Sequence, residues 1–113
     1  MCFLIGRGGA VLWADLSSSP VALPDSRARW EAIWRLREEL EEIAHSHPVG
    51  PLAFSHEDDT TMEALDQALG RRLRFSVVAP RGMVARTADG ERMLVDDEPF
   101  WAELLRSVSR MED

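Results

Sequence analysis

Hydrophobic and polar positions along the 113 residues change period several times, and each change predicts a new element. Short apolar runs indicate strands at residues 2–5, 10–13, 43–44 and 73–79. The first two runs flank Arg7-Gly8-Gly9, a combination typical of a β-hairpin. A second hairpin is expected from Met83 to Val95, with its turn at Ala88-Asp89-Gly90.

Apolar residues at helical spacing predict three helices. The first runs from about Ser26 to Glu42 after a polar loop at 17–24, with Asp25 or Ser26 as its cap. The second runs from Ser55 to Leu69 and stops at Gly70, and the third begins near Glu98. The residues expected to face the core are Trp30, Ile33, Trp34, Leu36, Leu40 and Ile43, then Met62, Leu65 and Leu69, then Phe100, Trp101, Leu104, Leu105 and Val108.

This order of elements, without repeats or low-complexity tracts, predicts a compact α/β domain. The hairpins favour a mostly antiparallel sheet with helices on its faces. A chain of 113 residues suffices for one core, so residues 1–113 are expected to form a single domain. The acidic residues Glu38, Glu39, Glu41 and Glu42 are expected to form a solvated face.

Composition narrows the classes of function. No apolar run approaches the roughly 18 residues of a membrane span, and the net charge of −7 argues against nucleic acid as a partner. Three arginines, Arg71, Arg72 and Arg74, favour a solvated strand edge over a binding site. Cys2 is the only cysteine, so an internal disulfide is excluded, which fits a reducing cytoplasm.

All three histidines fall between His45 and His56, followed closely by Asp58. His45 and His47, two positions apart on an extended backbone, point the same way and can reach one ion. Two imidazoles and a carboxylate are a ligand set that catalytic zinc prefers, with a fourth position left for water. His56 lies on the exposed helix start and is not expected to be a ligand.

A simpler interpretation stands beside the zinc site. Ser55 as N-cap puts Asp58 at the third helical position, so the two residues could merely cap the helix, as Ser-x-x-Glu boxes do. The histidines would then be loop residues. Taken together, the pair of histidines, the proline turn and the carboxylate at fixed spacing favour metal binding.

The pattern His45-Ser46-His47, seven residues, then Ser55-x-x-Asp58 resembles the signature of the JAMM metallopeptidases, also called MPN+ or Mov34/JAB domains. The order of elements is similar over nearly the whole chain. The resemblance implies a zinc hydrolase that cuts peptide or isopeptide bonds, commonly at the C-terminal tail of ubiquitin-like or sulfur-carrier proteins. By position, His45, His47 and Asp58 would hold zinc and Ser55 would donate a hydrogen bond to the oxyanion.

One feature of that family is not matched. Its general-base glutamate lies about seven residues before the glycine matched by Gly6, which places it before Met1. Either the start codon is misplaced, or another group substitutes, or the chain binds metal without peptidase activity. In a hairpin whose opposing residue numbers sum to about 15, Asp15 would lie beside that position, so Asp15 is the candidate substitute.

The sequence therefore predicts a zinc-dependent metallopeptidase or isopeptidase that acts on a small protein partner. The alternative is a catalytically silent MPN-type interaction module. A metal-binding domain unrelated to the family is the third interpretation.

Overall fold

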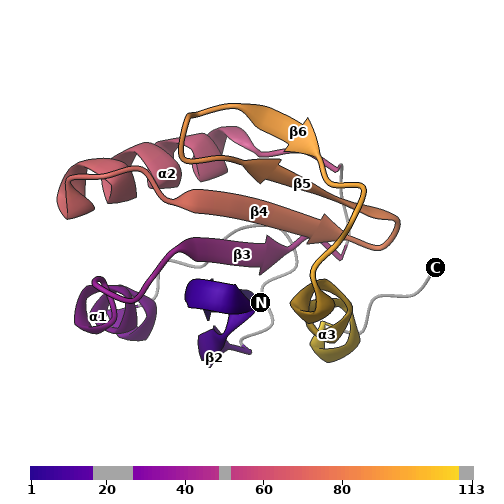
Figure 1. Cartoon of the computed structure of the whole chain (residues 1–113), viewed down its shortest axis with the longest axis horizontal. Coiled ribbons are helices and arrows are strands. Elements are labelled where there is room, and N and C mark those ends of the chain that lie inside the picture. Colours follow the sequence, from indigo (N-terminus) through magenta and orange to yellow (C-terminus); the bar gives the residue numbers. More distant parts are fainter. Residues whose placement is uncertain (17–26, 49–51, 110–113) are drawn as a thin grey trace.

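The computed structural model describes residues 1–16, 27–48 and 52–109 (Figure 1). In chain order the elements are β1 (Cys2–Ile5), the 3-10 turn η1 (Arg7–Gly9), β2 (Val11–Asp15), α1 (Arg27–Arg35), β3 (Glu42–Ser46), α2 (His56–Leu69), β4 (Arg74–Ala79), β5 (Gly82–Arg86), β6 (Arg92–Leu94) and α3 (Phe100–Val108). The predicted loop at 17–24 and the predicted cap at Asp25 or Ser26 lie outside the described residues.

The six strands form one sheet in the order β2-β1-β3-β4-β5-β6. Neighbouring strands are antiparallel except β3 and β4, which are parallel. A parallel pair needs a crossover connection, and α2 provides it. The predicted α/β fold with a mostly antiparallel sheet flanked by helices is thus confirmed. None of the helices among the described residues has the length and apolar character that a membrane crossing requires.

Side chains alternate between the two faces of the sheet, and each face carries its own core. On one face, α1 and α2 cover a first core made by Cys2, Leu4, Ala32, Ile33, Leu40, Ile43, Met62, Leu65, Leu73 and Phe75. On the other face, α3 covers a second core made by Phe3, Ile5, Ala44, Val78, Met83, Trp101, Ala102 and Leu105. His45 shares the face of Ile43 because the two residues are two positions apart on β3.

The elements with local start and stop signals lie where the sequence predicts them. Ser55 is the N-cap of α2, and Gly70 ends the helix in the left-handed conformation, with φ of 70°. Gly90 also has a positive φ, 87°, in the turn between β5 and β6. A residue with a Cβ is strained at such φ values, so Gly70 sets the end of α2 and Gly90 sets the turn between β5 and β6.

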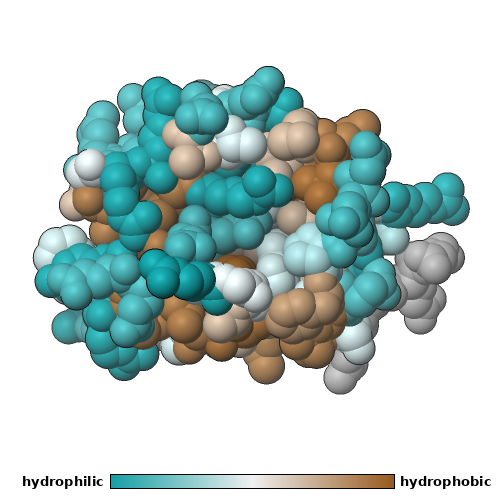
Figure 2. All heavy atoms as spheres, viewed as in Figure 1, coloured by the Kyte–Doolittle hydropathy of each residue, from teal (hydrophilic) through white to brown (hydrophobic). Residues whose placement is uncertain are grey.

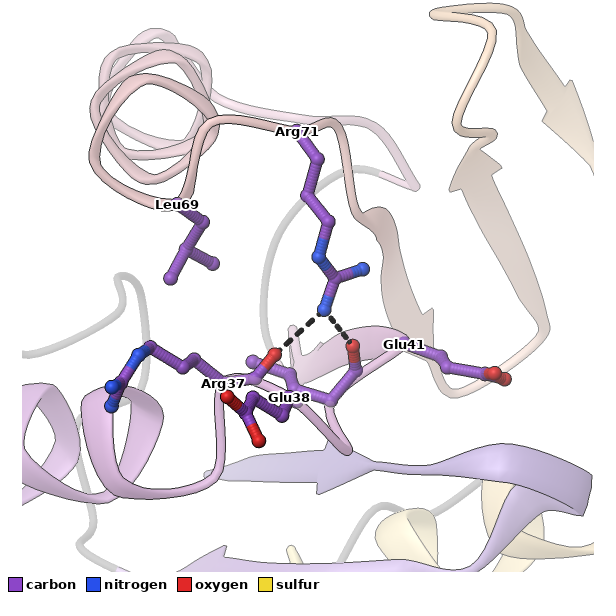
Figure 3. Close-up of a pocket in the computed structure, with 6 residues that line it drawn as sticks. Arg37, Glu38, Glu41, Leu69 and Arg71 are labelled. Carbon is purple, nitrogen blue, oxygen red and sulfur yellow. Dashed lines mark hydrogen bonds between the residues drawn. The ribbon is translucent and has the colours of Figure 1, made fainter.

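The first helix is shorter than predicted, since α1 ends at Arg35 and not near Glu42. The chain continues in turns, and the N–H of Glu41 then donates to the carbonyl of Ile5 as the strand pairing begins. Arg71 donates from Nη2 to the carbonyls of Arg37 and Leu40, at 2.7 and 2.5 Å, across a cleft of about 390 Å³ (Figure 3). Arg71 thus satisfies carbonyl groups that a longer helix would have bonded internally.

The buried side of α1 also differs from the prediction. Trp30 and Trp34 were expected in the core but are 38% and 55% exposed, and the Arg37 guanidinium lies 4.2 Å above the Trp34 ring. Arg29 is buried instead, with Ala32 and Ile33. Its guanidinium pairs with Asp15 at 2.7 Å, so the side of α1 that faces the sheet includes a buried ion pair in place of the two tryptophans.

Three further predictions of burial or exposure are wrong. Phe100 and Leu104, expected to face inward, are 67% and 46% exposed, because α3 rests on Trp101, Ala102 and Leu105. Figure 2 shows exposed hydrophobic atoms on the side of the molecule where β2 and α3 lie in Figure 1. Glu42, expected on a solvated face, is largely buried in β3, where Ser76 donates a hydrogen bond to its carboxylate.

The ion pair between Arg86 and Asp66 tests this packing. Arg86 donates two hydrogen bonds to Asp66 and one to the carbonyl of Leu73. We expect Asp66→Asn to lower the free energy of unfolding by about 3 kcal/mol, because it leaves a buried guanidinium without its carboxylate. The measurement is chemical denaturation in the presence of a metal chelator.

A matched control lies on the same helix. Asp59 pairs with Arg92 at 2.7 Å, but both side chains are about half exposed, at 42% and 51%. Asp59→Asn should therefore cost no more than about 1 kcal/mol. Equal losses of unfolding free energy in Asp66→Asn and Asp59→Asn would contradict the greater burial of the pair between Arg86 and Asp66.

Candidate metal centre

The two histidines lie at the C-terminal end of β3, in the interior of the sheet. His45 is aligned with Cys2 of β1 and Val77 of β4. His47 follows the strand by one residue, and its N–H donates to the carbonyl of Val78 at 2.9 Å. Both side chains leave the same face, and each histidine is only 4% exposed.

Asp58 approaches the histidines from the first turn of α2. The Asp58 N–H donates to Ser55 Oγ at 3.0 Å, and the Ser55 N–H donates to Asp58 Oδ2 at 2.7 Å, which completes a capping box. Asp58 is 1% exposed. Capping therefore does occur, as in the simpler interpretation, but the same carboxylate also faces both imidazoles.

Side chains of three residues converge at this point. The Nε2 atoms of His45 and His47 are 3.0 Å apart, Asp58 Oδ1 lies 3.2 Å from Nε2 of His45, and Oδ2 lies 3.5 Å from Nε2 of His47. Ligand atoms about 2.1 Å from one tetrahedral zinc ion lie about 3.4 Å apart, and the observed spacings of 3.0 to 3.5 Å, which involve both carboxylate oxygens, are near this value. Oδ1 is buried without a hydrogen bond of normal geometry. The donor set and this orphaned oxygen both fit a metal ion.

Electrostatics favour the protonation states that metal binding needs at His45 and Asp58. Burial lowers the pKa of His45 and outweighs the opposing effect of Asp58, so the ring is neutral at pH 7. Burial alone would raise the pKa of Asp58, but the two histidines and the Ser55 N–H hold it well below its usual range. Neutral imidazoles and an ionised carboxylate are the forms that coordinate a divalent ion.

Ser55 and His56 occupy the start of α2. The Ser55 hydroxyl accepts the Asp58 N–H, and its own hydrogen is left to donate to another group. His56 is exposed. Among the described residues, the group that is close enough to hold a metal consists of His45, His47 and Asp58, and His56 is not part of it.

Asp15 does not lie where the predicted hairpin register would put it. Opposing residue numbers in β1 and β2 sum to 17 over most of the pair, so Asp15 is aligned with Cys2 and, one strand further, with His45. The predicted sum of about 15 is wrong, because β2 begins one residue later than expected and η1 occupies the turn. The Asp15 carboxylate pairs with Arg29 at 2.7 Å.

Arg29 is the site neighbour that the sequence pattern did not reveal. It lies on the buried side of α1, where its side chain is 5% exposed. Its position three and four residues before Ala32 and Ile33 places it in the helical stripe of buried residues. An arginine in such a stripe, together with an acidic residue on a neighbouring strand, is the available signal for a buried ion pair.

Comparison of the chain with models of known protein families gives no match, and neither do comparisons with curated proteins and with solved structures.

The metal centre predicts that the purified protein binds about one zinc ion per chain. We expect His47→Ala to lose most of this zinc, because it removes one of three ligands. Metal content by mass spectrometry and a competition titration with a chelator measure the effect. His56→Ala is the matched control and should keep wild-type zinc content, since His56 is exposed at the same end of α2. A wild-type protein that takes up no added zinc would contradict the assignment.

Proposed function

We propose that this protein is a zinc-dependent metallopeptidase or isopeptidase of the JAMM type. The observation that carries the proposal is the convergence of His45, His47 and Asp58 in one buried cluster with spacings that suit a tetrahedral ion. The family and the peptide substrate rest on the resemblance of the histidine and Ser-Asp pattern. An ion at this site would supply a Lewis acid that polarises a carbonyl and activates water at neutral pH.

The protein's own groups have separate roles in this proposal. His45, His47 and Asp58 hold the ion, and the Ser55 N–H fixes the Asp58 carboxylate. The Ser55 hydroxyl donates to the oxygen that becomes negative when the peptide carbonyl is attacked. A donor of this kind is worth about 10²- to 10³-fold in turnover.

The substrate class in this proposal is the C-terminal tail of a ubiquitin-like or sulfur-carrier protein. We place the activity in the cytoplasm, because the single cysteine is consistent with a reducing compartment. The Cys2 thiol is completely buried, and burial raises its pKa to about 11, so it stays protonated. Cys2 is therefore unsuited to act as the thiolate nucleophile of a cysteine peptidase.

A catalytically silent metal-binding module is the second candidate function. The ion pair between Asp15 and Arg29 favours it, because the Asp15 carboxylate is already bound to a buried guanidinium. The two candidates differ in whether a proton reaches the leaving amine, a step that raises the reaction rate by about 10²- to 10⁴-fold.

Ser55 separates an oxyanion role from a capping role. Ser55→Ala should lower turnover of a ubiquitin-like conjugate by about 10²- to 10³-fold and also cost about 1 kcal/mol of stability through the lost cap. Ser55→Gly also removes the hydroxyl but costs only a few tenths of a kcal/mol as an N-cap. We expect equal losses of turnover in both variants, with zinc retained. Near-normal turnover in Ser55→Gly would show that the hydroxyl serves only the helix.

Asp15 decides between the enzyme and the silent module. Asp15→Asn is nearly isosteric and cannot accept a proton. If Asp15 is the base, the variant should keep its zinc and lose about 10²- to 10⁴-fold in turnover. Turnover and metal content are measured on the same samples, with a thermal melt to confirm that Arg29 tolerates the change. Equal activity in both proteins would place the proton carrier elsewhere, and an inactive wild type with bound zinc would favour the silent module.

A further inference from the structure

Arg106 links α3 to the end of the sheet that carries the histidines. Helix α3 lies on the opposite face from the metal ligands, as the two cores show. Arg106 nevertheless donates from Nε to the carbonyl of Ala79 at 2.8 Å and from Nη2 to the carbonyl of Gly82 at 3.1 Å. These carbonyls flank the turn between β4 and β5, so one guanidinium joins both sides of that turn.

Acidic side chains fix the guanidinium in this place. Glu98 accepts two hydrogen bonds from Arg106, at 2.6 and 2.8 Å, and Glu103 accepts a third at 2.5 Å. The Arg106 side chain is 11% exposed, and its hydrogen bonds hold the pKa of Glu98 below its usual value. A guanidinium with a bidentate carboxylate has a defined orientation, and Arg106 therefore presents its remaining donors to the turn at fixed positions.

The strand ends that Arg106 holds contact the backbone of His47 and the segment that leads into α2. On the β4 side, the carbonyl of Val78, next to Ala79, accepts the N–H of His47. On the β5 side, Gly82 lies so close to Leu52 that a Cβ at this position would be 2.7 Å from Leu52 Cδ2. Leu52 belongs to the segment that leads into Ser55 and α2. A displacement of the turn would therefore move both a histidine ligand and the segment before Asp58.

We propose that Arg106 is a positioning residue for the metal centre. By holding the carbonyls of Ala79 and Gly82, it sets where β4 ends and hence where His47 and the segment 52–55 lie. Arg106 touches no ligand atom, and its influence passes through the backbone of the turn. The inference rests on the metal centre proposed above.

Arg86 provides a matched control for a purely structural role. Its side chain is 10% exposed, it makes two hydrogen bonds to the carboxylate of Asp66, and it donates to the carbonyl of Leu73. Leu73 immediately precedes β4, at the opposite end of the strand from the histidines. Arg86 and Arg106 thus hold the two ends of the same strand by the same chemistry, and the end held by Arg106 is the one next to His47.

The test compares Arg106→Gln with Arg86→Gln in the full chain. Zinc affinity is measured by competition with a chelator, and the ligand geometry by the visible absorption spectrum of the protein loaded with Co²⁺. We expect Arg106→Gln to weaken zinc binding about 10-fold, the lower end of the effect for outer groups that orient ligands, and to change the Co²⁺ spectrum. Arg86→Gln should match the wild type in both, and Arg106→Lys should recover part of the affinity.

Several outcomes would overturn the inference. Wild-type affinity and spectrum in Arg106→Gln would remove the positioning role, and equal losses in the two glutamine variants would reduce it to general stability. If Arg106→Gln or Arg86→Gln does not fold, Glu98→Gln and Asp66→Asn are compared in their place. Each of these two variants releases one guanidinium from its carboxylate. A wild-type protein that binds neither zinc nor Co²⁺ would contradict the metal centre itself, and that failure is seen before any variant is compared.

Discussion

Asp58 brings a carboxylate into the interior, where it is 1% exposed and water does not solvate its charge. An ionised group in such a place costs several kcal/mol unless partners surround it. The capping box supplies one partner, and the two histidines at the end of β3 supply the others. The start of α2 is therefore fixed against the end of β3, and this contact sets how Met62 and Leu65 enter the first core.

The parts of the fold that the sequence predicts well depend on neighbours along the chain. Ser55 and Gly70 bound α2 because one accepts the N–H of a residue three positions later and the other adopts a positive φ. The proposed metal ligands are equally local, since strand periodicity aligns His45 with His47 and the capping box fixes Asp58. Short-range geometry is enough to predict these features without knowledge of the sheet order.

The errors arise where contacts between distant segments decide. The periodicity of α1 permits a buried side with Trp30 and Trp34, and the observed side differs because Arg29 pairs with Asp15 of β2. Glu42 likewise contacts a distant partner. Its carboxylate accepts a hydrogen bond from Ser76 of β4, a strand that follows only after α2. The register of β1 and β2 is a local exception, because it depends on how η1 fills the turn between two neighbouring strands. A hydrophobic pattern gives the width of a buried stripe more reliably than its exact orientation.

The groups of the candidate centre differ in how far apart they lie along the chain. Residues 45–58 carry all three proposed ligands, and loops of about ten residues close within about 10–100 ns. Asp15 reaches the same row of the sheet only through the pairing of β2 with β1 and of β1 with β3. Pairing between more distant segments costs more chain entropy before its contacts form. The three candidate ligands therefore lie within one short span of the chain, whereas the position of Asp15 depends on two successive strand pairings.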